Sequence, residues 1–397
     1  MSPPDPLLFQ ENSTAFDGAR RYHTGSCGIR LLSLHPAFYP TFAPVLPVLD
    51  LLKHLVRFPS LSRQEGPLAD FVEHYLQEAG LPTGRLGDNV YGWLGEGEDR
   101  LLLNSHLDVV PPSEDHPFDP FEPVERDGQV YGRGTVDAKA SGAAMLTAVL
   151  DLARQGWRPP GGQVIVALTA CEETGGADNG LQNLRPHLPP LRAALVGEPT
   201  QMRPCVSQGG LLILRLEAHG RSAHAARSHL GENAIYKAMR DLQRLEAFRF
   251  DRADPYLGPP TVTPTVIEGG SARNMVPDRC TVYLDVRTNA SYTHDELTAL
   301  LSDILESEVH VHSKRLIPVA TDPSERIVQA CLAALPGVEP IGSPTMSDWL
   351  FLHDIPTVKI GPGLSERSHT AHEHIAVADL EAAVPVYQRI IRHYFEG

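Results

Sequence analysis

The sequence predicts an α/β protein whose main sheet is covered by helices on both faces, with a smaller domain inserted into it. The chain has 397 residues, which exceeds the usual size of one hydrophobic core and favours two domains. Short apolar runs at 101–106, 163–170 and 192–198 are bounded by polar or turn residues, as buried parallel strands are. A helical pattern at 138–155 lies between the first two runs. This alternation of strand and helix is typical of an α/β sheet.

The other elements follow in order along the chain. Apolar residues recur at helical spacing over 48–57 and 67–79, and Gly80 ends the second helix. Near residue 210 the pattern changes to strand, helix, strand, strand and helix, with one more strand at 308–315. After this unit, 356–363 predicts another strand of the first domain and 377–393 predicts a closing amphipathic helix.

These changes divide the chain into a discontinuous catalytic domain and an insertion. The insertion has roughly the size of an independent α+β domain. Residues 1–44 show no clean period and form an N-terminal extension of unclear role. The predicted boundaries are 45–209 for the first part of the catalytic domain, 210–316 for the inserted domain and 317–397 for the second part.

Composition limits the classes of partner. Lys and Arg total 34 against 49 Asp and Glu, so the net charge of −15 disfavours nucleic acid and an anionic membrane as partners. The first residues lack a basic segment followed by an apolar stretch, and Pro44 and Pro47 interrupt the apolar run at 41–56. The five cysteines are odd in number and contain no CxxC pair, which is typical of reduced thiols in a cytoplasmic protein.

Residues able to bind a metal follow several of the predicted strands. His106 and Asp108 end the first strand, and their spacing of two places both side chains on the same face. A metal-bound imidazole needs an acceptor for its other nitrogen, commonly a carboxylate. His106 as a ligand with Asp108 behind it fits that need, although an HxD pair alone is weak evidence.

Four further clusters follow the same rule. Asp137 lies in a glycine-containing loop before a helix, where a simple capping role is the alternative. Glu172 and Glu173 are adjacent acids at a strand end, and two such carboxylates repel each other unless a cation or a shared proton compensates. A solvated surface loop is the alternative. Glu198 ends the next strand, where a surface glutamate is the alternative. The last cluster, at 368–377, supplies His369, His372, Glu373 and His374.

Together the five clusters favour a metal centre. The carboxyl ends of the strands form the ligand crevice of an open α/β sheet. Histidines and carboxylates without thiolate suit zinc, cobalt or manganese and argue against a structural zinc finger. The groups are too many for one tetrahedral site but would equip two metal ions and leave one carboxylate to act on water, which indicates a hydrolase.

The motifs HLDVVP, GRGTVDAKAS, EETGG, GEPT and GRSAHAA occur in this order, followed by GGSARNMVPDRC and HTAHE. The series resembles the dizinc aminoacylase/carboxypeptidase metallopeptidase family that includes acetylornithine deacetylase and succinyl-diaminopimelate desuccinylase, over about residues 47–397. The resemblance implies a catalytic domain with a mixed sheet flanked by helices and an inserted lid domain that forms a homodimer. It also implies two zinc ions, with cobalt or manganese as possible substitutes. The implied ligands are His106 and Glu198 on one ion, Glu173 and His369 on the other, and Asp137 bridging both.

The same resemblance assigns further roles. Glu172 would be the general base that activates a metal-bridging water, assisted by Asp108 behind His106. His224 matches a lid histidine that stabilises the oxyanion across the dimer, although the residues alone indicate a surface loop. Asn274 and Arg287 match lid positions associated with the substrate's carboxylate, a task that suits the planar guanidinium of arginine. A surface charge on a strand is the alternative for Arg287.

Other enzyme classes lack their motifs. GxSxG, HExxH, a P-loop and GxGxxG are all missing from the sequence. A non-catalytic metal-binding relative would have lost a metal ligand or the general base. The five implied ligands and Glu172 are all present. The predicted activity is hydrolysis of the amide bond of an N-acyl amino acid, with an acetylornithine-like substrate favoured. Succinyl-diaminopimelate, dipeptides and C-terminal residues stay open, and Ser347–Asp348 falls where desuccinylases carry a similar pair.

Overall fold

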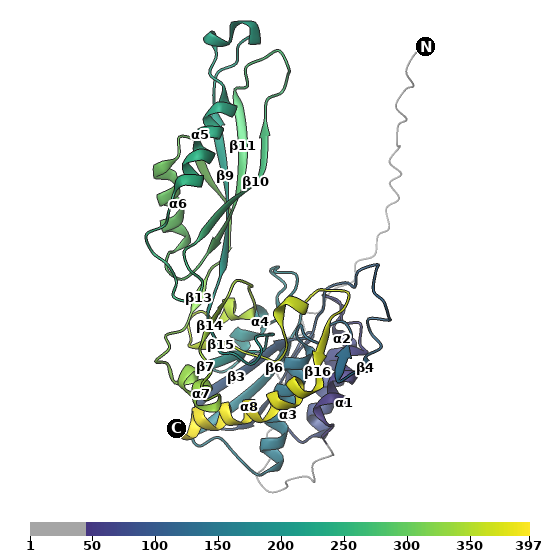
Figure 1. Cartoon of the computed structure of the whole chain (residues 1–397). Coiled ribbons are helices and arrows are strands. Elements are labelled where there is room, and N and C mark those ends of the chain that lie inside the picture. Colours follow the sequence, from purple (N-terminus) through teal and green to yellow (C-terminus); the bar gives the residue numbers. More distant parts are fainter. Residues whose placement is uncertain (1–44) are drawn as a thin grey trace, which may run out of the picture. The chain divides into compact units, whose positions relative to one another are not determined.

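The computed structural model describes residues 45–397, and Figure 1 shows the arrangement of its elements. The predicted extension 1–44, with Cys27, lies outside the described residues. The predicted strands at 101–106, 163–170 and 192–198 all form and lie next to one another in parallel, in the order β6-β3-β7. The predicted α/β class is therefore confirmed.

The large sheet has nine strands in the order β1-β2-β6-β3-β7-β15-β8-β13, with β14 paired to β8. It is mixed, because β2 runs antiparallel to β6 while β15 runs parallel to β7. The sequence pattern missed the antiparallel hairpin of β1 and β2. The strands are β1 (Thr83–Leu86), β2 (Asn89–Gly95), β3 (Asp99–His106), β6 (Gly162–Thr169), β7 (Ala193–Val196), β8 (Cys205–Gln208), β13 (Val319–Ala320), β14 (Ile341–Ser343) and β15 (Thr357–Lys359).

Alternating side chains of the central strands enter two different cores. Leu101 and Leu103 pack on the face covered by helices α1, α2, α3, α7 and α8, whereas Leu102 packs on the face covered by α4 and the 3₁₀ turn η3. Both faces are buried, which explains why these strands read as continuous apolar runs. The helices are α1 (Val48–Val56), α2 (Gly66–Glu78), α3 (Lys139–Arg154), α4 (Gly180–Leu184), α7 (Arg326–Ala334) and α8 (Val377–Glu396), and the 3₁₀ turns are η1 (Arg185–His187), η3 (Asp348–Leu352) and η4 (Ser365–Arg367).

Helix α3 lies against the sheet because its sequence is rich in small residues. Nearly all of its side chains are buried, and it also packs against α1 and α8. A Cβ atom at Gly142 would lie 3.2 Å from a methyl carbon of Leu168 on β6. Helix and strand therefore approach closely at the level where the site residues emerge.

A second sheet of four antiparallel strands has the order β10-β11-β9-β12. Helices α5 and α6 pack against it around a core of its own. The strands and helices follow one another in the predicted order. These elements fall within 210–316, whereas β8 and β13 on either side of this range belong to the large sheet; the boundaries themselves stay a prediction. The elements are β9 (Gly210–His219), η2 (Ala225–Leu230), α5 (Ala234–Ala247), β10 (Thr261–Gly269), β11 (Arg279–Thr288), α6 (His294–Ile304) and β12 (Glu308–Leu316).

A small third sheet, which the sequence pattern did not predict, connects two distant segments. Its order is β16-β5-β4, formed by β4 (Val124–Arg126), β5 (Gln129–Tyr131) and β16 (His374–Ala376). His374 pairs with Tyr131 across it. The sheet thus brings the loop that contains His369 beside the loop that contains Asp137.

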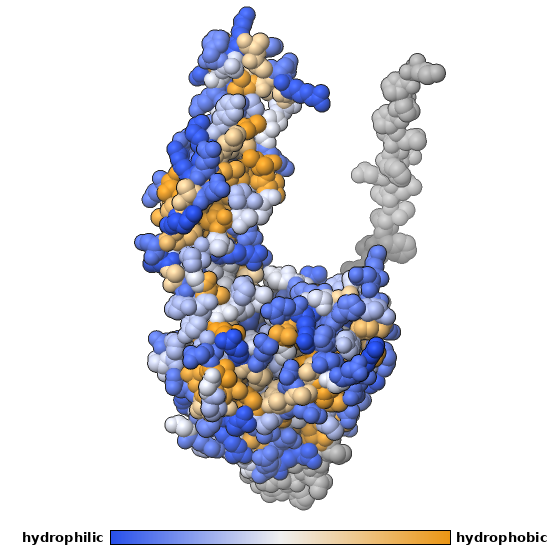
Figure 2. All heavy atoms as spheres, in the orientation of Figure 1, coloured by the Kyte–Doolittle hydropathy of each residue, from blue (hydrophilic) through white to orange (hydrophobic). Residues whose placement is uncertain are grey.

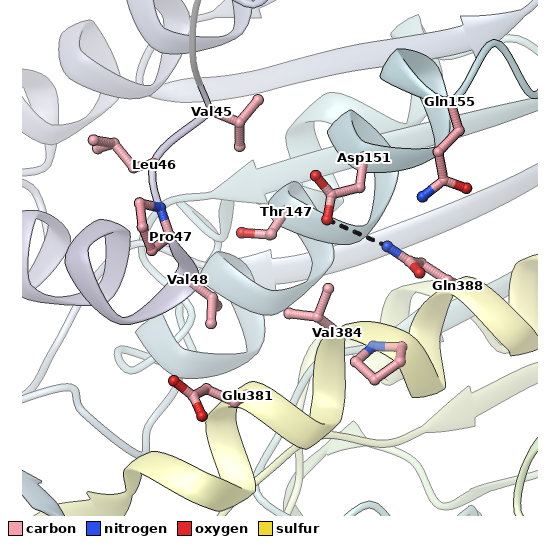
Figure 3. Close-up of a pocket in the computed structure, with 11 residues that line it drawn as sticks. Val45, Leu46, Pro47, Val48, Thr147, Asp151, Gln155, Glu381, Val384 and Gln388 are labelled. Atoms are coloured by element: carbon pink, nitrogen blue, oxygen red, sulfur yellow. Dashed lines mark hydrogen bonds between the residues drawn. The ribbon is translucent and has the colours of Figure 1, made fainter.

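A shallow pocket lies between α1, α3 and α8. Figure 3 shows Asp151 of α3 accepting a hydrogen bond of 3.4 Å from Gln388 of α8 beside it. None of the predicted site residues lines this pocket. In the part of the chain that the structure describes, none of the helices is both long and apolar enough to cross a membrane.

Candidate metal centre

His106 is the last residue of β3, and its ring is buried. Ring atom Nδ1 lies 2.8 Å from the backbone carbonyl of Asp108, and Nε2 lies 3.1 Å from Asp137 Oδ1. A carbonyl oxygen can only accept, so Nδ1 donates, and Nε2 is the ring nitrogen that faces the carboxylates. This is the orientation that a metal ligand needs. The acceptor behind His106 is thus chiefly the carbonyl of Asp108, whose carboxylate Oδ1 is 3.6 Å from Nδ1.

The Asp108 carboxylate supports the acid pair instead. Its Oδ1 accepts the backbone N–H of Glu172 at 3.0 Å, and its Oδ2 accepts that of Glu173 at 3.1 Å. Ser62 Oγ donates a third hydrogen bond of 2.8 Å to Oδ2. Burial alone would raise the pKa of Asp108, but its contacts with His106 and these donors hold the pKa below its ordinary value. Asp108 therefore connects the loops of the first two clusters.

Asp137 lies between two groups of candidate ligands. His106, Asp137 and Glu198 form one group, and Asp137, Glu173 and His369 form the other; within each group the ligand atoms all lie within 4.8 Å of one another. Asp137 Oδ2 is 3.3 Å from His369 Nε2, while Oδ1 faces His106. The capping alternative does not apply, because Ala138 is the N-cap residue of α3 and no side-chain cap bond is present there.

The second group comes from three separate loops. His369 Nε2 lies 3.0 Å from Glu173 Oε1, although the two residues are 196 positions apart. His369 has a positive φ of 63°, an uncommon conformation for a residue other than glycine. Among the described residues, His372 belongs to neither group.

The electrostatics of the cluster favour a bound cation. Burial, reinforced by Asp137, raises the pKa of Glu198 to about 8. Hydrogen bonds to Asp137 and Glu173 raise the pKa of His369 to about 10. Without a metal the cluster therefore retains protons, which is expected where carboxylates gather in a poorly solvated site. The donors are imidazole nitrogens and carboxylate oxygens, a set that fits zinc, cobalt or manganese.

Glu172 belongs to neither group but interacts electrostatically with members of both, His106 and Glu198 of the first and Glu173 of the second. Within the described residues its carboxylate has no hydrogen bond or ion pair, and its backbone N–H is held by Asp108. Burial raises the pKa of Glu172 well above its ordinary value, and the nearby Glu198 and Asp348 add to this effect. A carboxylate that is neither coordinated nor paired is available to accept a proton.

The predicted lid residues lie on the second sheet and its loops. His224 is exposed and its Nδ1 accepts the N–H of Ala226 at 3.1 Å, while the Asn274 carbonyl accepts the N–H of Ala225. These two residues are therefore on adjoining loops. Arg287 is exposed on β11 and forms an ion pair with Asp285 at 2.8 Å. None of the three belongs to a ligand group, so their roles stay predictions.

Two buried carboxylates have supporting roles that the sequence did not predict. Glu65, just before α2, is buried and accepts the N–H of Cys171 at 2.9 Å, which holds the residue before Glu172 at a positive φ of 58°. Glu373 is also buried and forms an ion pair with Arg133. Glu373 lies beside histidines in a cluster that the sequence marks as a candidate site. No sequence signal marks Glu65.

The model of the peptidase family M20/M25/M40 matches residues 102–393. The succinyl-diaminopimelate desuccinylase of Rhodospirillum centenum is 31% identical over 378 residues, covering 87% of this chain and 97% of that protein. That of Wolbachia pipientis wMel is 26% identical over 371 residues, covering 87% and 93%.

Solved structures show the same fold. Aminopeptidase PepT of Bacillus cereus has a TM-score of 0.71 at 19% identity, covering 87% of this chain and 98% of that chain. YXEP of Bacillus subtilis, described as a dinuclear metal binding peptidase, has a TM-score of 0.67 at 16% identity, covering 88% and 98%. The match over most of the chain is decisive: the protein belongs to the peptidase family M20/M25/M40 and is a metal-dependent hydrolase.

Proposed function

We propose that the two ligand groups hold two zinc ions that share Asp137, with cobalt or manganese as substitutes. The first ion would be held by His106 and Glu198 and the second by Glu173 and His369. The observation that carries this proposal is the membership of Asp137 in both groups, with one carboxylate oxygen toward each histidine. When bound, the ions polarise an amide carbonyl and lower the pKa of water.

Glu172 is the general base of the proposed reaction. It takes a proton from the attacking water as the oxygen bonds to the amide carbon, and it delivers that proton to the nitrogen as the C–N bond breaks. The products are a carboxylic acid and an amine. Burial raises the pKa of Glu172 above its ordinary value, which makes the carboxylate a stronger proton acceptor. The Asp108 carboxylate fixes the position of Glu172 by accepting the backbone N–H of Glu172.

The substrate is proposed to be an N-acyl amino acid, with N-succinyl-diaminopimelate as the first candidate. The similar sequences named above are desuccinylases, which favours a succinyl group over the acetylornithine that the sequence analysis preferred. Ser347–Asp348 does not support either choice directly, since both side chains are buried. Ser347 bonds Gln208 at 2.6 Å, and Asp348 accepts from Asn179 at 2.7 Å.

A substrate panel separates these possibilities. The full-length protein, loaded with zinc or cobalt, is assayed with N-succinyl-LL-diaminopimelate, N-acetyl-L-ornithine and a dipeptide. We expect the succinyl substrate to give the highest kcat/KM, and chelation to abolish turnover. Faster hydrolysis of N-acetyl-L-ornithine restores the deacetylase assignment, and faster hydrolysis of the dipeptide restores the peptidase assignment. Two bound metals without turnover of any of the three favour the non-catalytic alternative.

The proposed assembly is a homodimer formed through the second sheet. Strand β10 is an edge strand whose Val266 and Ile267 are exposed, and Tyr236 and Met239 of α5 are also exposed. Figure 2 shows hydrophobic residues gathered on the surface of this unit. An exposed apolar edge strand is usually paired or covered. A partner on this edge would also give His224 the setting in which it could act across the dimer.

The proposed location is the cytoplasm. Cys171, Cys205, Cys280 and Cys331 are free thiols in the described part of the chain, as expected in a reducing compartment.

A further inference from the structure

One buried carboxylate connects the two loops that supply Asp137 and His369. Glu373 Oε1 accepts the backbone N–H groups of Val136 at 2.9 Å and of Asp137 at 3.1 Å. The backbone carbonyl of Glu373 accepts the N–H of Gly132 at 3.2 Å. Glu373 thus contacts both ends of the 132–137 loop, and it lies four positions after His369.

The charge of Glu373 is compensated where it lies. Arg133 Nη1 is 2.7 Å from Glu373 Oε2, and both side chains are almost completely buried. A buried carboxylate is tolerated only when a counter-charge and hydrogen bonds satisfy it, and here both oxygens are occupied. The pair therefore holds the loops without adding net negative charge beside the ligand cluster.

We propose that Glu373 is a positioning residue that presets Asp137 for two metal ions and fixes the His369 loop against it. Asp137 serves both ligand groups, so an error in its backbone would disturb both ions. Outer contacts of this kind typically contribute 10–100-fold to metal affinity. The inference rests on the two-metal centre proposed above and extends it to a residue outside the ligand set.

The rival explanation is that the Arg133–Glu373 pair stabilises the fold and nothing more. Two double variants separate the explanations. The first, called the double-leucine variant, replaces both residues by leucine; it fills the space without an unpaired charge but leaves the Val136 and Asp137 N–H groups without an acceptor. The second, called the glutamine combination, joins Glu373→Gln with Arg133→Leu and restores a neutral acceptor oxygen for these groups.

Metal binding to the full-length protein tests the proposal. Metal is removed by chelation, and Co²⁺ binding is followed by calorimetry and by the visible absorption of the bound ion. We expect the double-leucine variant to bind Co²⁺ at least about 10-fold more weakly than the wild type. The glutamine combination should recover most of this loss. Glu366→Gln, which changes an exposed glutamate of the same segment, is the matched control and should leave binding unchanged.

Each outcome decides between the explanations. A double-leucine variant that has a lower Tm but binds Co²⁺ as the wild type does overturns the positioning role, and so does failure of the glutamine combination to recover affinity. If the double-leucine variant does not fold, Glu373→Asp replaces it, because the shorter carboxylate keeps the Arg133 pairing but cannot span both contacts. Wild-type affinity in Glu373→Asp then also overturns the role. If the wild type binds fewer than two Co²⁺ ions, the proposed metal centre itself is contradicted. If every variant binds two Co²⁺ ions with equal affinity, only the positioning role of Glu373 is overturned.

Discussion

Asp108 holds Glu172 by its backbone: the carboxylate Oδ1 accepts the Glu172 N–H at 3.0 Å. The same carboxylate accepts the N–H of Glu173, so one side chain sets the positions of the proposed base and of a proposed ligand. Its backbone carbonyl meanwhile orients His106. The residue that the sequence places behind the first ligand therefore also organises the acid pair in the loop after the neighbouring strand β6.

Replacing Asp108 with asparagine should lower kcat and weaken metal binding together. An amide offers one acceptor atom instead of two, so one of the Glu172 and Glu173 N–H groups loses its partner. We expect kcat to fall about 10–100-fold with a smaller change in KM. Steady-state kinetics and Co²⁺ titration check this, with Asp303→Asn at an exposed position as control. An unchanged kcat would show that the hydrogen bonds accepted by the Asp108 carboxylate are dispensable.

Metal binding should release protons at pH 7. Glu198, with a pKa of about 8, and His369, with a pKa of about 10, are protonated in the metal-free protein at this pH, and both must lose their protons to coordinate. Because the raised pKa values favour the protonated forms, apparent Co²⁺ affinity should rise as the pH increases from 6 to 8. Calorimetry in phosphate and in Tris, which differ in ionisation enthalpy, measures the release. Identical heats in both buffers contradict the prediction.

Removing the Glu65 carboxylate should destabilise the loop before the base. Glu65→Ala leaves the buried N–H of Cys171 without an acceptor, at a position whose positive φ already disfavours a side chain. We expect the free energy of unfolding to fall by about 1–3 kcal/mol. Urea denaturation measures this loss, and Glu65→Gln, which keeps an acceptor oxygen, should lose less. Equal losses in both variants argue that the charge of Glu65 matters more than the hydrogen bond.

A charge on the exposed edge strand should dissociate the proposed dimer. Ile267 is 53% exposed on β10, where a partner strand would cover it. We expect Ile267→Lys to be monomeric by light scattering while the wild type is dimeric, because lysine on an edge strand opposes pairing. Thr265→Lys, which places the same charge at another position of β10, is made for comparison. A monomeric wild type rejects the dimer outright.

Much of the candidate site could be predicted because of one geometric rule. Parallel strands end at the same edge of a sheet, so polar residues that follow them converge there, as His106, Glu173 and Glu198 do. Asp137 fits the same pattern from a loop. Periodicity also identified the strands and the long helices, since buried strands and amphipathic helices have distinct spacing of apolar residues.

The supporting residues could not be predicted because they depend on long-range pairing. Arg133 and Glu373 are 240 positions apart, and Glu65 and Cys171 are 106 apart. Nothing in local spacing links such residues. The three-stranded sheet that joins β16 to β5 was missed for the same reason, because its strands have only three residues each.

The adjacent acids Glu172 and Glu173 test the central claim most directly. We assign proton transfer to the first and metal binding to the second. We therefore expect Glu172→Gln to retain two Co²⁺ ions while kcat falls about 10²–10⁴-fold. Glu173→Gln should instead lose or greatly weaken one ion. The measurement is bound metal and turnover of the same purified samples. If Glu172→Gln loses metal, or if it keeps wild-type turnover, the assignment of base and ligand is wrong.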